Sequence, residues 1–549
     1  MRILLAVLLL LLSQLALANP KVAIASAHPL ATQAGFDIIE RGGNVFDAAV
    51  AISSTLAVVE PMSSGLGGGG YWLLHRADGL ETLIDGRETA PSAAHKDMYL
   101  DKNKQPIAKA SLEGALSSAI PALPAALVHL AQKYGQLPLA ESLKPAINHA
   151  KNGFAINNRY LKLLKFRYDV LKNYPTSSAI FLTNGQLPQP FSILRQPELA
   201  NTLEQLAKNG HAGFYKGEIA ERLINSVQKS GGIWTKEDLN NYHVIERTPL
   251  KTYYKGITVT SSAPSSSGGT VLIEALNILS GYDLSSYSGI NQKHLIIEAL
   301  RQAYHDRALY LGDTDFINAP IQQLINTNYA ADLRKTISLD KALNSAQLAK
   351  APAIKQGDNT THFSIIDEQG NRVAATLSIN FPFGSAFVAE GTGVLLNDEM
   401  DDFSTAIGIA NGYGLVGNEA NAIAPNKRML SSMSPSFLED NQRVAVLGTP
   451  GGSRIISMVL LAALDFAQGH NPDSWVKVPR FHHQYLPDII EYEANALTAE
   501  ELKGLSDKGH TLKEAKYRYG DMQAVLFNKN THDLLAASDP RGEGRAEVK

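Results

Sequence analysis

Two adjacent threonines, Thr360 and Thr361, end a tract rich in Ala, Lys and Gln and begin a strand-like alternation in DNTTHFSIID, residues 358–367. A threonine hydroxyl is a weak nucleophile at neutral pH and needs a base beside it. If the chain is cut before Thr360, the freed α-amine, with a pKa of about 8, supplies that base within the same residue. The Thr360 hydroxyl can make the cut by attacking the Asn359 carbonyl, which gives an ester that water opens. The stretch therefore suggests a precursor that cuts itself and carries a threonine nucleophile.

The same residues allow a different interpretation, because Asn359-Thr360-Thr361 is an N-x-[ST] glycosylation sequon, which marks an exposed loop in a secreted protein. A glycan on Asn359 would crowd the peptide bond that has to be cut, so the two interpretations compete. The nucleophile hypothesis needs a rigid strand after the cut and a loose segment before it. We expect 361–367 to be that strand and 346–359 to be that segment.

The composition is that of a globular protein with a large buried core, since 44% of the 549 residues are apolar and 19% are charged. The net charge of -3 suggests neither a nucleic-acid nor an anionic-membrane partner. The chain has no cysteine, which excludes disulfides, thiol nucleophiles and Cys-ligated zinc.

No cofactor or metal is expected from the motifs. GLGGGG at 65–70 matches the G-x-G-x-x-G sequence of a dinucleotide-binding fingerprint. It follows a helical run and precedes a strand, however, whereas the fingerprint needs a strand before it and a helix after it. We expect these glycines to let backbone pass close to backbone or ligand. The histidine pair in RFHHQ, His482 and His483, lacks the spacing of metal ligands and is expected to be packed or hydrogen-bonded.

The first residues predict export. Arg2 precedes an apolar run over 3–12 and the small-x-small sequence ALA at 16–18. The run is shorter than the roughly 20 residues that a bilayer needs, so we expect a signal peptide, 1–18, cleaved after Ala18, and not an anchor. No later stretch is apolar and long enough to span a membrane. The predicted location is periplasmic or secreted, and the lack of cysteine fits the periplasm.

The predicted secondary structure changes once along the chain, at Asn359, from mostly helices to mostly β-hairpins. The sequence has no internal repeat. This pattern favours one α+β layered domain. Periodicity predicts helices over 30–43, 47–61, 121–135, 217–232 and 270–281, and strands over 256–262, 362–367, 372–380, 444–450 and 523–528.

Six motifs in chain order resemble the γ-glutamyltranspeptidase family: GLGGGGYW, DGRETAP, NTTHFSIID, NDEMDDFS, PNKRMLSSMSPS and GTPGGSRI. The likeness runs from about residue 20 to ASDPRGEG at 537–544. It implies an N-terminal nucleophile hydrolase, with an α+β fold built as a four-layer αββα sandwich by two subunits cut from one precursor. The helix-rich large subunit would be 19–359 and the small subunit 360–549, held together as a heterodimer.

The resemblance also implies roles for single residues. Thr360 would be the nucleophile and its new amine the general base, with the processing site between Asn359 and Thr360. Ser378 falls where many members carry a second threonine that orients the first. Tyr413 lies where some members have a lid tyrosine, so we expect a partly covered pocket.

Substrate binding needs charged partners, because a γ-glutamyl group has an α-carboxylate and an α-ammonium at one end. Arg87 in DGRETAP can offer a bidentate fork to the carboxylate. The resemblance adds donors for the tetrahedral intermediate in the backbone N–H groups of the PGG sequence. The other expected substrate or oxyanion residues are Ser431 and Ser432 for the carboxylate, Asn380, Glu399 and Asp402 for the ammonium, and Gly451 and Gly452 for the oxyanion.

Three functions follow as hypotheses. The first is a γ-glutamyl hydrolase and transferase acting on glutathione and related compounds, whose ester on Thr360 is resolved by water or by the amine of an acceptor amino acid or dipeptide. The second is a glutaryl or cephalosporin acylase of the same superfamily, but a glutaryl group lacks the ammonium that Glu399 and Asp402 would hold. The third is a non-catalytic periplasmic binding protein, which has no reason to be cut before Thr360.

Overall fold

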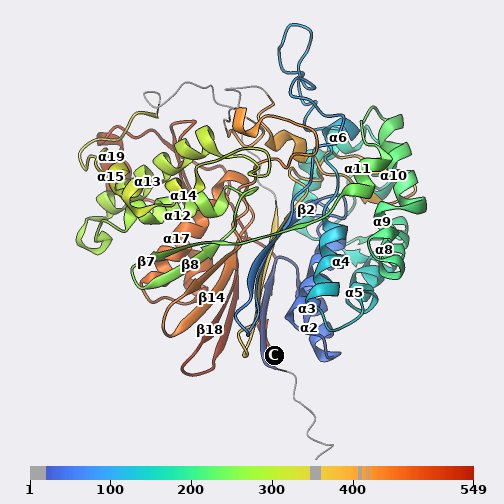
Figure 1. The fold of residues 1–549 in the computed structure, drawn as a ribbon, viewed down its shortest axis with the longest axis horizontal. Coiled ribbons are helices and arrows are strands. Elements are labelled where there is room, and N and C mark those ends of the chain that lie inside the picture. Colours follow the sequence, from blue (N-terminus) through green and yellow to red (C-terminus); the bar gives the residue numbers. More distant parts are fainter. Residues whose placement is uncertain (1–19, 346–359, 406–410, 416, 418) are drawn as a thin grey trace, which may run out of the picture.

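Two β-sheets stack face to face, and helices cover the outer face of each (Figure 1). The computed structural model describes residues 20–345, 360–405, 411–415, 417 and 419–549. The predicted signal peptide, Asn359 and the segment before it lie outside the described residues. The four layers, helix, sheet, sheet and helix, confirm the predicted αββα sandwich.

The first sheet has seven strands, and each pair of neighbours in it is antiparallel. In spatial order they are β20 (Arg545–Val548), β1 (Val22–Ser26), β9 (Thr361–Asp367), β10 (Arg372–Ser378), β2 (Gly69–His75), β3 (Glu81–Gly86) and β6 (Ile245–Arg247). Strands from the two sides of Asn359 are neighbours in it: β1 lies between β20 and β9, and β2 pairs with β10. The two predicted subunits therefore share one sheet, and cutting the chain between them would leave this pairing in place.

The second sheet has six strands, also drawn from both parts of the chain. They are β19 (Leu534–Ser538), β18 (Gln523–Asn528), β14 (Arg443–Gly448), β13 (Ser436–Glu439), β8 (Ile257–Ser261) and β7 (Leu250–Tyr254). Short strands form three smaller sheets: β4 (Phe154–Ala155) with β5 (Ile193–Leu194), β11 (Val388–Ala389) with β12 (Val394–Leu395), and β15 (Phe481–His482), β16 (Ile490–Tyr492) and β17 (Leu512–Glu514).

Helices from the first part of the chain cover the first sheet, and α12, α17 and α18 pack on the second. The helices near the first sheet are α2 (Pro29–Glu40), α3 (Val45–Val59), α4 (Leu123–Lys133), α5 (Leu139–Asn152), α6 (Asn158–Leu171), α7 (Pro175–Phe181), α8 (Pro197–Asn209), α9 (Ala212–Tyr215), α10 (Gly217–Lys229) and α11 (Lys236–Asn241). Those on the other side are α12 (Gly268–Leu279), α13 (Gly289–Tyr310), α14 (Ile321–Leu324), α15 (Thr327–Arg334), α17 (Ile455–Ala467), α18 (Pro472–Lys477) and α19 (Ala499–Asp507). No described helix is both long and apolar enough to cross a bilayer.

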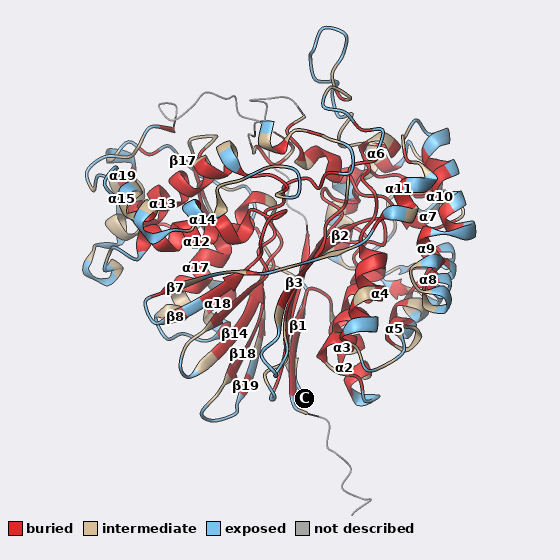
Figure 2. Cartoon of the chain, in the orientation of Figure 1, coloured by how far each residue is buried: buried red, intermediate tan, exposed pale blue. Residues whose placement is uncertain are grey.

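The local sequence explains the elements that matter most for the site. Every residue of β9 and β10 is buried, because one face packs on helix α3 and the other on the second sheet. Figure 2 shows that the strands between the two helical layers are mostly buried, and that many exposed residues lie on the outer helices and loops. Helix α3 begins with a capping box, in which Asn44 accepts the N–H of Asp47 and the Asp47 carboxylate accepts the N–H of Asn44. Helix α3 on one face and the second sheet on the other therefore hold the hairpin of β9 and β10 in place.

The glycine run before β2 allows close backbone packing, as the sequence predicted. A Cβ atom on Gly68 would lie 2.1 Å from the carbonyl oxygen of Ser378, and one on Gly67 would lie 2.1 Å from that of Leu395. Any side chain here would push β10 away from β2. These glycines therefore place the end of β10, where Ser378 lies.

Candidate active site

A small polar pocket opens where the hairpin of β9 and β10 ends. The empty space in it, including the space at its mouth, is about 320 Å³. The sequence-predicted residues that line it are Arg87, Thr360, Ser378, Asn380, Glu399, Asp402, Tyr413, Ser431, Ser432 and Gly452. Gly451 precedes Gly452 in the chain, and Asn359 lies outside the described residues. Residues spread over more than 360 positions thus meet at one place.

Thr360 lies directly before β9, at the pocket end of the strand. Its neighbour Thr361 pairs with Leu377 of β10, which brings Ser378 to the same end of the hairpin. Thr360 is only 3% exposed. Since the strand behind it is buried on both faces, the hydroxyl is held at a fixed position relative to the pocket.

Asn380 lies just after β10 in a left-handed conformation, with φ of 72°. Its backbone N–H donates to the Ser378 hydroxyl at 2.8 Å, and its side-chain amide donates to the carbonyl of Asp398 at 2.9 Å. A non-glycine residue with positive φ is uncommon and has to be held by its surroundings. These bonds hold the turn that carries the Asn380 side chain into the pocket.

Arg87 follows strand β3 and is only 1% exposed. Its two terminal nitrogens donate to one carboxylate each, Nη1 to Glu399 and Nη2 to Asp402, both at 2.5 Å. From the sequence we expected the guanidinium to face a substrate carboxylate and the two acids to face an ammonium. The structure pairs them with each other, because a buried charge is costly unless an opposite charge contacts it.

The pocket holds more acid than this one guanidinium neutralises. Burial raises the pKa of Glu399 to about 7, against the lowering effect of Arg87. Burial also raises the pKa of Asp402, and it raises the pKa of Glu88 well above its ordinary value. The carboxylate oxygen Oε2 of Glu88 lies 3.6 Å from Nη1 of Arg87. This part of the pocket is therefore suited to a ligand with a positive charge.

A tyrosine covers Gly452, one of the two residues that the resemblance assigns to the oxyanion. Tyr413 is buried, its hydroxyl donates to the carbonyl of Asn380 at 2.9 Å, and its ring tilts against Phe381. Gly452 has φ of 57°, and a Cβ there would lie 2.4 Å from the Tyr413 ring. The close approach of chain and ring thus requires glycine at 452. The residues 406–410 just before this segment lie outside the described part of the chain.

The sequence did not reveal Arg307, a second guanidinium that lines the pocket. It lies near the end of α13, and its Nε donates to the Ser267 hydroxyl at 2.9 Å. A charged residue in a 22-residue helix is ordinarily interpreted as part of a solvated face, and only the burial of α13 shows otherwise. The apolar wall was also missed; it consists of Leu415, Leu430, Met433 and Ile455.

Two histidine groups lie outside this pocket. His482 and His483 are both buried, and the first contacts the Ser457 hydroxyl at 2.9 Å, so the predicted structural pair is confirmed. His294 contacts His510 at 2.7 Å beside Glu298, a group with three potential metal ligands. The guanidinium of Arg301 donates to Glu298 at 3.2 Å and approaches His510 at 3.4 Å, so hydrogen bonds already engage these ligand atoms.

Comparison with known proteins adds the family context. The model of the gamma-glutamyltranspeptidase family matches residues 31–548. A glutathione hydrolase proenzyme of Escherichia coli (strain K12) is 42% identical over 528 residues, which are 94% of this chain and 90% of the relative.

Two solved structures show the same architecture. A cephalosporin acylase from Bacillus halodurans matches with a TM-score of 0.85 and 27% identity over 96% of both chains. A gamma-glutamyltranspeptidase of Helicobacter pylori matches with a TM-score of 0.58 and 40% identity over 59% of this chain and 94% of that one. Proteins named for different reactions share this fold, so the choice of substrate must be argued from the site.

Proposed function

Since the chain belongs to the γ-glutamyltranspeptidase family and is a γ-glutamyl hydrolase and transferase of the N-terminal nucleophile type, we propose that Thr360 is its nucleophile and glutathione a substrate. The membership confirms the resemblance found in the sequence. One observation carries the assignment of the site: Thr360, at the head of a buried strand, shares its pocket with Arg87, Glu399 and Asp402. The proposed nucleophile and the charged groups that would bind the α-ammonium and α-carboxylate of a substrate thus line the same small pocket.

The reaction begins when the Thr360 hydroxyl attacks the γ-carbonyl carbon and the α-amine of Thr360 takes its proton. The N–H groups of Gly451 and Gly452 stabilise the oxyanion. The amide C–N bond breaks, and the leaving amine takes the proton from the Thr360 amine. Water or an acceptor amine then attacks the ester, its proton passes through the same amine, and the Thr360 hydroxyl is restored. Ser378 and Asn380 keep the nucleophile and the turn beside it in place.

Self-processing uses the same hydroxyl on the peptide bond after Asn359. The products are a large subunit, 19–359, and a small subunit, 360–549, after removal of a signal peptide, 1–18. The shared sheet supports a lasting heterodimer, because β1 of the large subunit pairs with both β9 and β20 of the small one. With this signal peptide the protein would be exported to the periplasm or secreted.

The proposed substrate class is tested by comparing two chromogenic anilides. The L-γ-glutamyl anilide has both the α-ammonium and the carboxylate, whereas the glutaryl anilide lacks the ammonium. We expect kcat/KM to be about 100-fold or more higher for the γ-glutamyl compound, because only its ammonium can bind Glu399 and Asp402, whose charges Arg87 alone does not balance. An equal or higher rate on glutaryl would instead support an acylase, and an uncut chain inactive on both would support a binding protein.

The acidity of Glu399 predicts a pH dependence of substrate binding. The pKa of Glu399 is about 7, so the side chain is charged above pH 7 and loses its attraction for the substrate ammonium below it. We expect KM for the γ-glutamyl anilide to rise by up to about tenfold from pH 8 to pH 6, while the ammonium stays charged. In Glu399→Gln the KM should be higher at pH 8 and nearly flat over this range. A variant with the wild-type slope would assign the titration to another group.

A further inference from the structure

The pocket has an unequal distribution of positive charge. Arg87 already donates both of its terminal nitrogens to Glu399 and Asp402. These three groups together are negative when ionised, and they favour the ammonium end of a substrate more than its carboxylate end. Among the described residues that line the pocket, Arg307 is the remaining cation. Its guanidinium contacts the Ser432 hydroxyl, and its charge also acts on Asp402, where it partly offsets the rise in pKa that burial causes.

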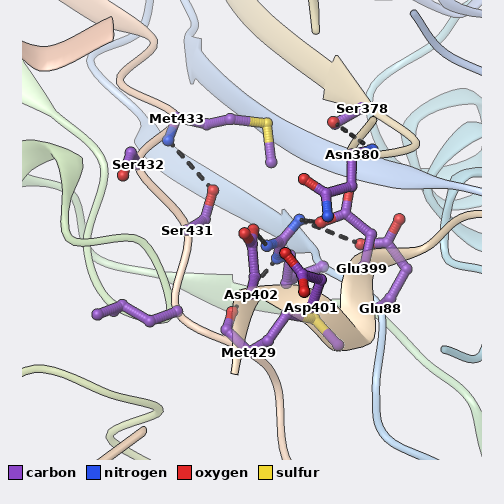
Figure 3. A network of polar contacts seen from close by, with 12 residues as sticks. Glu88, Ser378, Asn380, Glu399, Asp401, Asp402, Met429, Ser431, Ser432 and Met433 are labelled. Carbon is purple, nitrogen blue, oxygen red and sulfur yellow. Dashed lines mark hydrogen bonds and ion pairs between the residues drawn. The ribbon is translucent and has the colours of Figure 1, made fainter. Parts of the chain in front are cut away.

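The two serines have hydroxyl hydrogens left for a ligand. Ser431 accepts the backbone N–H of Met433 at 3.1 Å, and Ser432 accepts Nη2 of Arg307 at 3.3 Å. Both hydroxyls thus use a lone pair on an N–H donor, and neither donates to an acceptor among the described residues. Each therefore has a hydrogen to offer to an anion. Figure 3 shows Ser431 and Ser432 on neighbouring positions of one segment across from Glu399.

Arg307 also holds that segment from behind. Its Nε donates to the Ser267 hydroxyl at 2.9 Å, and that hydroxyl in turn donates to the carbonyl of Ser431 at 2.7 Å. The guanidinium is buried, and its position near the end of α13 favours a positive charge. One side chain thus contacts the Ser432 hydroxyl directly and fixes the backbone of Ser431 through Ser267.

We propose that Arg307 is a positioning residue for the α-carboxylate of the γ-glutamyl substrate, acting through Ser432, whose hydroxyl it turns into a donor. The proposal rests on the function proposed above. Because a guanidinium donates and cannot accept, the Ser432 hydrogen has to point away from Arg307, and it stays available to an acceptor bound in the pocket that Ser432 lines. The substrate carboxylate then accepts from Ser431 and Ser432 with the charge of Arg307 behind them, while Glu399 and Asp402 receive the ammonium.

The test compares two donors in wild type and Arg307→Gln. The first is the L-γ-glutamyl anilide, and the second is the 4-aminobutanoyl anilide, which keeps the ammonium but lacks the α-carboxylate. In Arg307→Gln we expect KM for the γ-glutamyl anilide to rise at least about tenfold with kcat changed less than threefold. For 4-aminobutanoyl anilide kcat/KM should change less than about twofold. A loss of kcat/KM that is equal on both donors would show a merely structural role and overturn the proposal.

Two further variants isolate the route through Ser432. If Arg307 acts through that hydroxyl, Arg307→Gln should cost less in a Ser432→Ala background than in wild type, and full additivity would contradict the proposal. Arg307→Lys keeps the charge but cannot bind both Ser267 and Ser432, so its KM should lie between wild type and Arg307→Gln. This variant also serves as the test if Arg307→Gln fails to fold.

The matched control is Arg301→Lys on the same helix. Arg301 is also buried, but it pairs with Glu298 and Asp488 and does not line the pocket, so KM should stay at the wild-type value. Subunit formation is checked for every variant on a denaturing gel. Wild-type protein inactive on the γ-glutamyl anilide would defeat the proposed function itself. Active wild type with an unchanged Arg307→Gln would defeat this inference alone.

Discussion

Thr360→Ala is expected to yield a single uncut chain with no measurable γ-glutamyl hydrolase activity. The alanine removes the hydroxyl that attacks the carbonyl of Asn359, so neither the cut nor the new α-amine is formed. The fold should persist, because Thr360 lies before the first paired residue of β9 and alanine has no bulk to place. The measurement is intact mass under denaturing conditions, in which wild type should give two chains, the smaller beginning at Thr360.

The neighbouring threonine provides the control. Thr361 is equally buried, but it points to the opposite side of the strand and does not line the pocket. Thr361→Ala should therefore still be cut and active, and Thr360→Ser should be cut more slowly because it keeps a hydroxyl. Cleavage of Thr360→Ala at the 359/360 bond by its own action would show that another residue is the nucleophile.

Individual helices and strands could be predicted from the sequence because they depend on short-range patterns of residues. The strand expected over 523–528 coincides with β18, and the helix expected over 217–232 is α10, which ends three residues earlier at Lys229. Helix ends depend on the first residue that leaves the hydrogen-bond ladder, which periodicity does not define. The order of strands in the sheets could not be predicted from the sequence. Strand β1 pairs with β9 and β20, which are hundreds of residues away along the chain, and no local pattern encodes such a register.

The site was predictable as far as its residues fall in the family motifs. Those motifs named Arg87, Glu399 and Asp402, but they did not indicate that Arg87 forms ion pairs with both acids. Arg307 was not named, because its function depends on the burial of α13 and on the fold bringing that helix beside Ser432. A residue whose role depends on a tertiary contact is not marked by any characteristic spacing in the sequence.

Arg87→Met is expected to cost about 3–5 kcal/mol of stability at pH 8 and to abolish activity. The methionine fills much of the space, but it leaves Glu399 and Asp402 buried without the cation that each contacts at 2.5 Å. The same substitution at Arg76 is the matched control. Arg76 pairs with Asp78 at 2.6 Å on the surface, where water screens the ion pair, so Arg76→Met should unfold near the wild-type temperature.

The pH dependence of this loss identifies its cause. Without Arg87, the folded-state pKa values of Glu399 and Asp402 rise further above those of the unfolded chain, and burial already raises both in the wild type. A group with a raised folded pKa contributes its full stability below its unfolded pKa and loses it as pH rises through the folded pKa. The gap in unfolding temperature between Arg87→Met and wild type should therefore shrink as pH falls from 8 to 5.5. A gap independent of pH would mean that methionine fails to pack, and that the charge of Arg87 is not what stabilises the pocket.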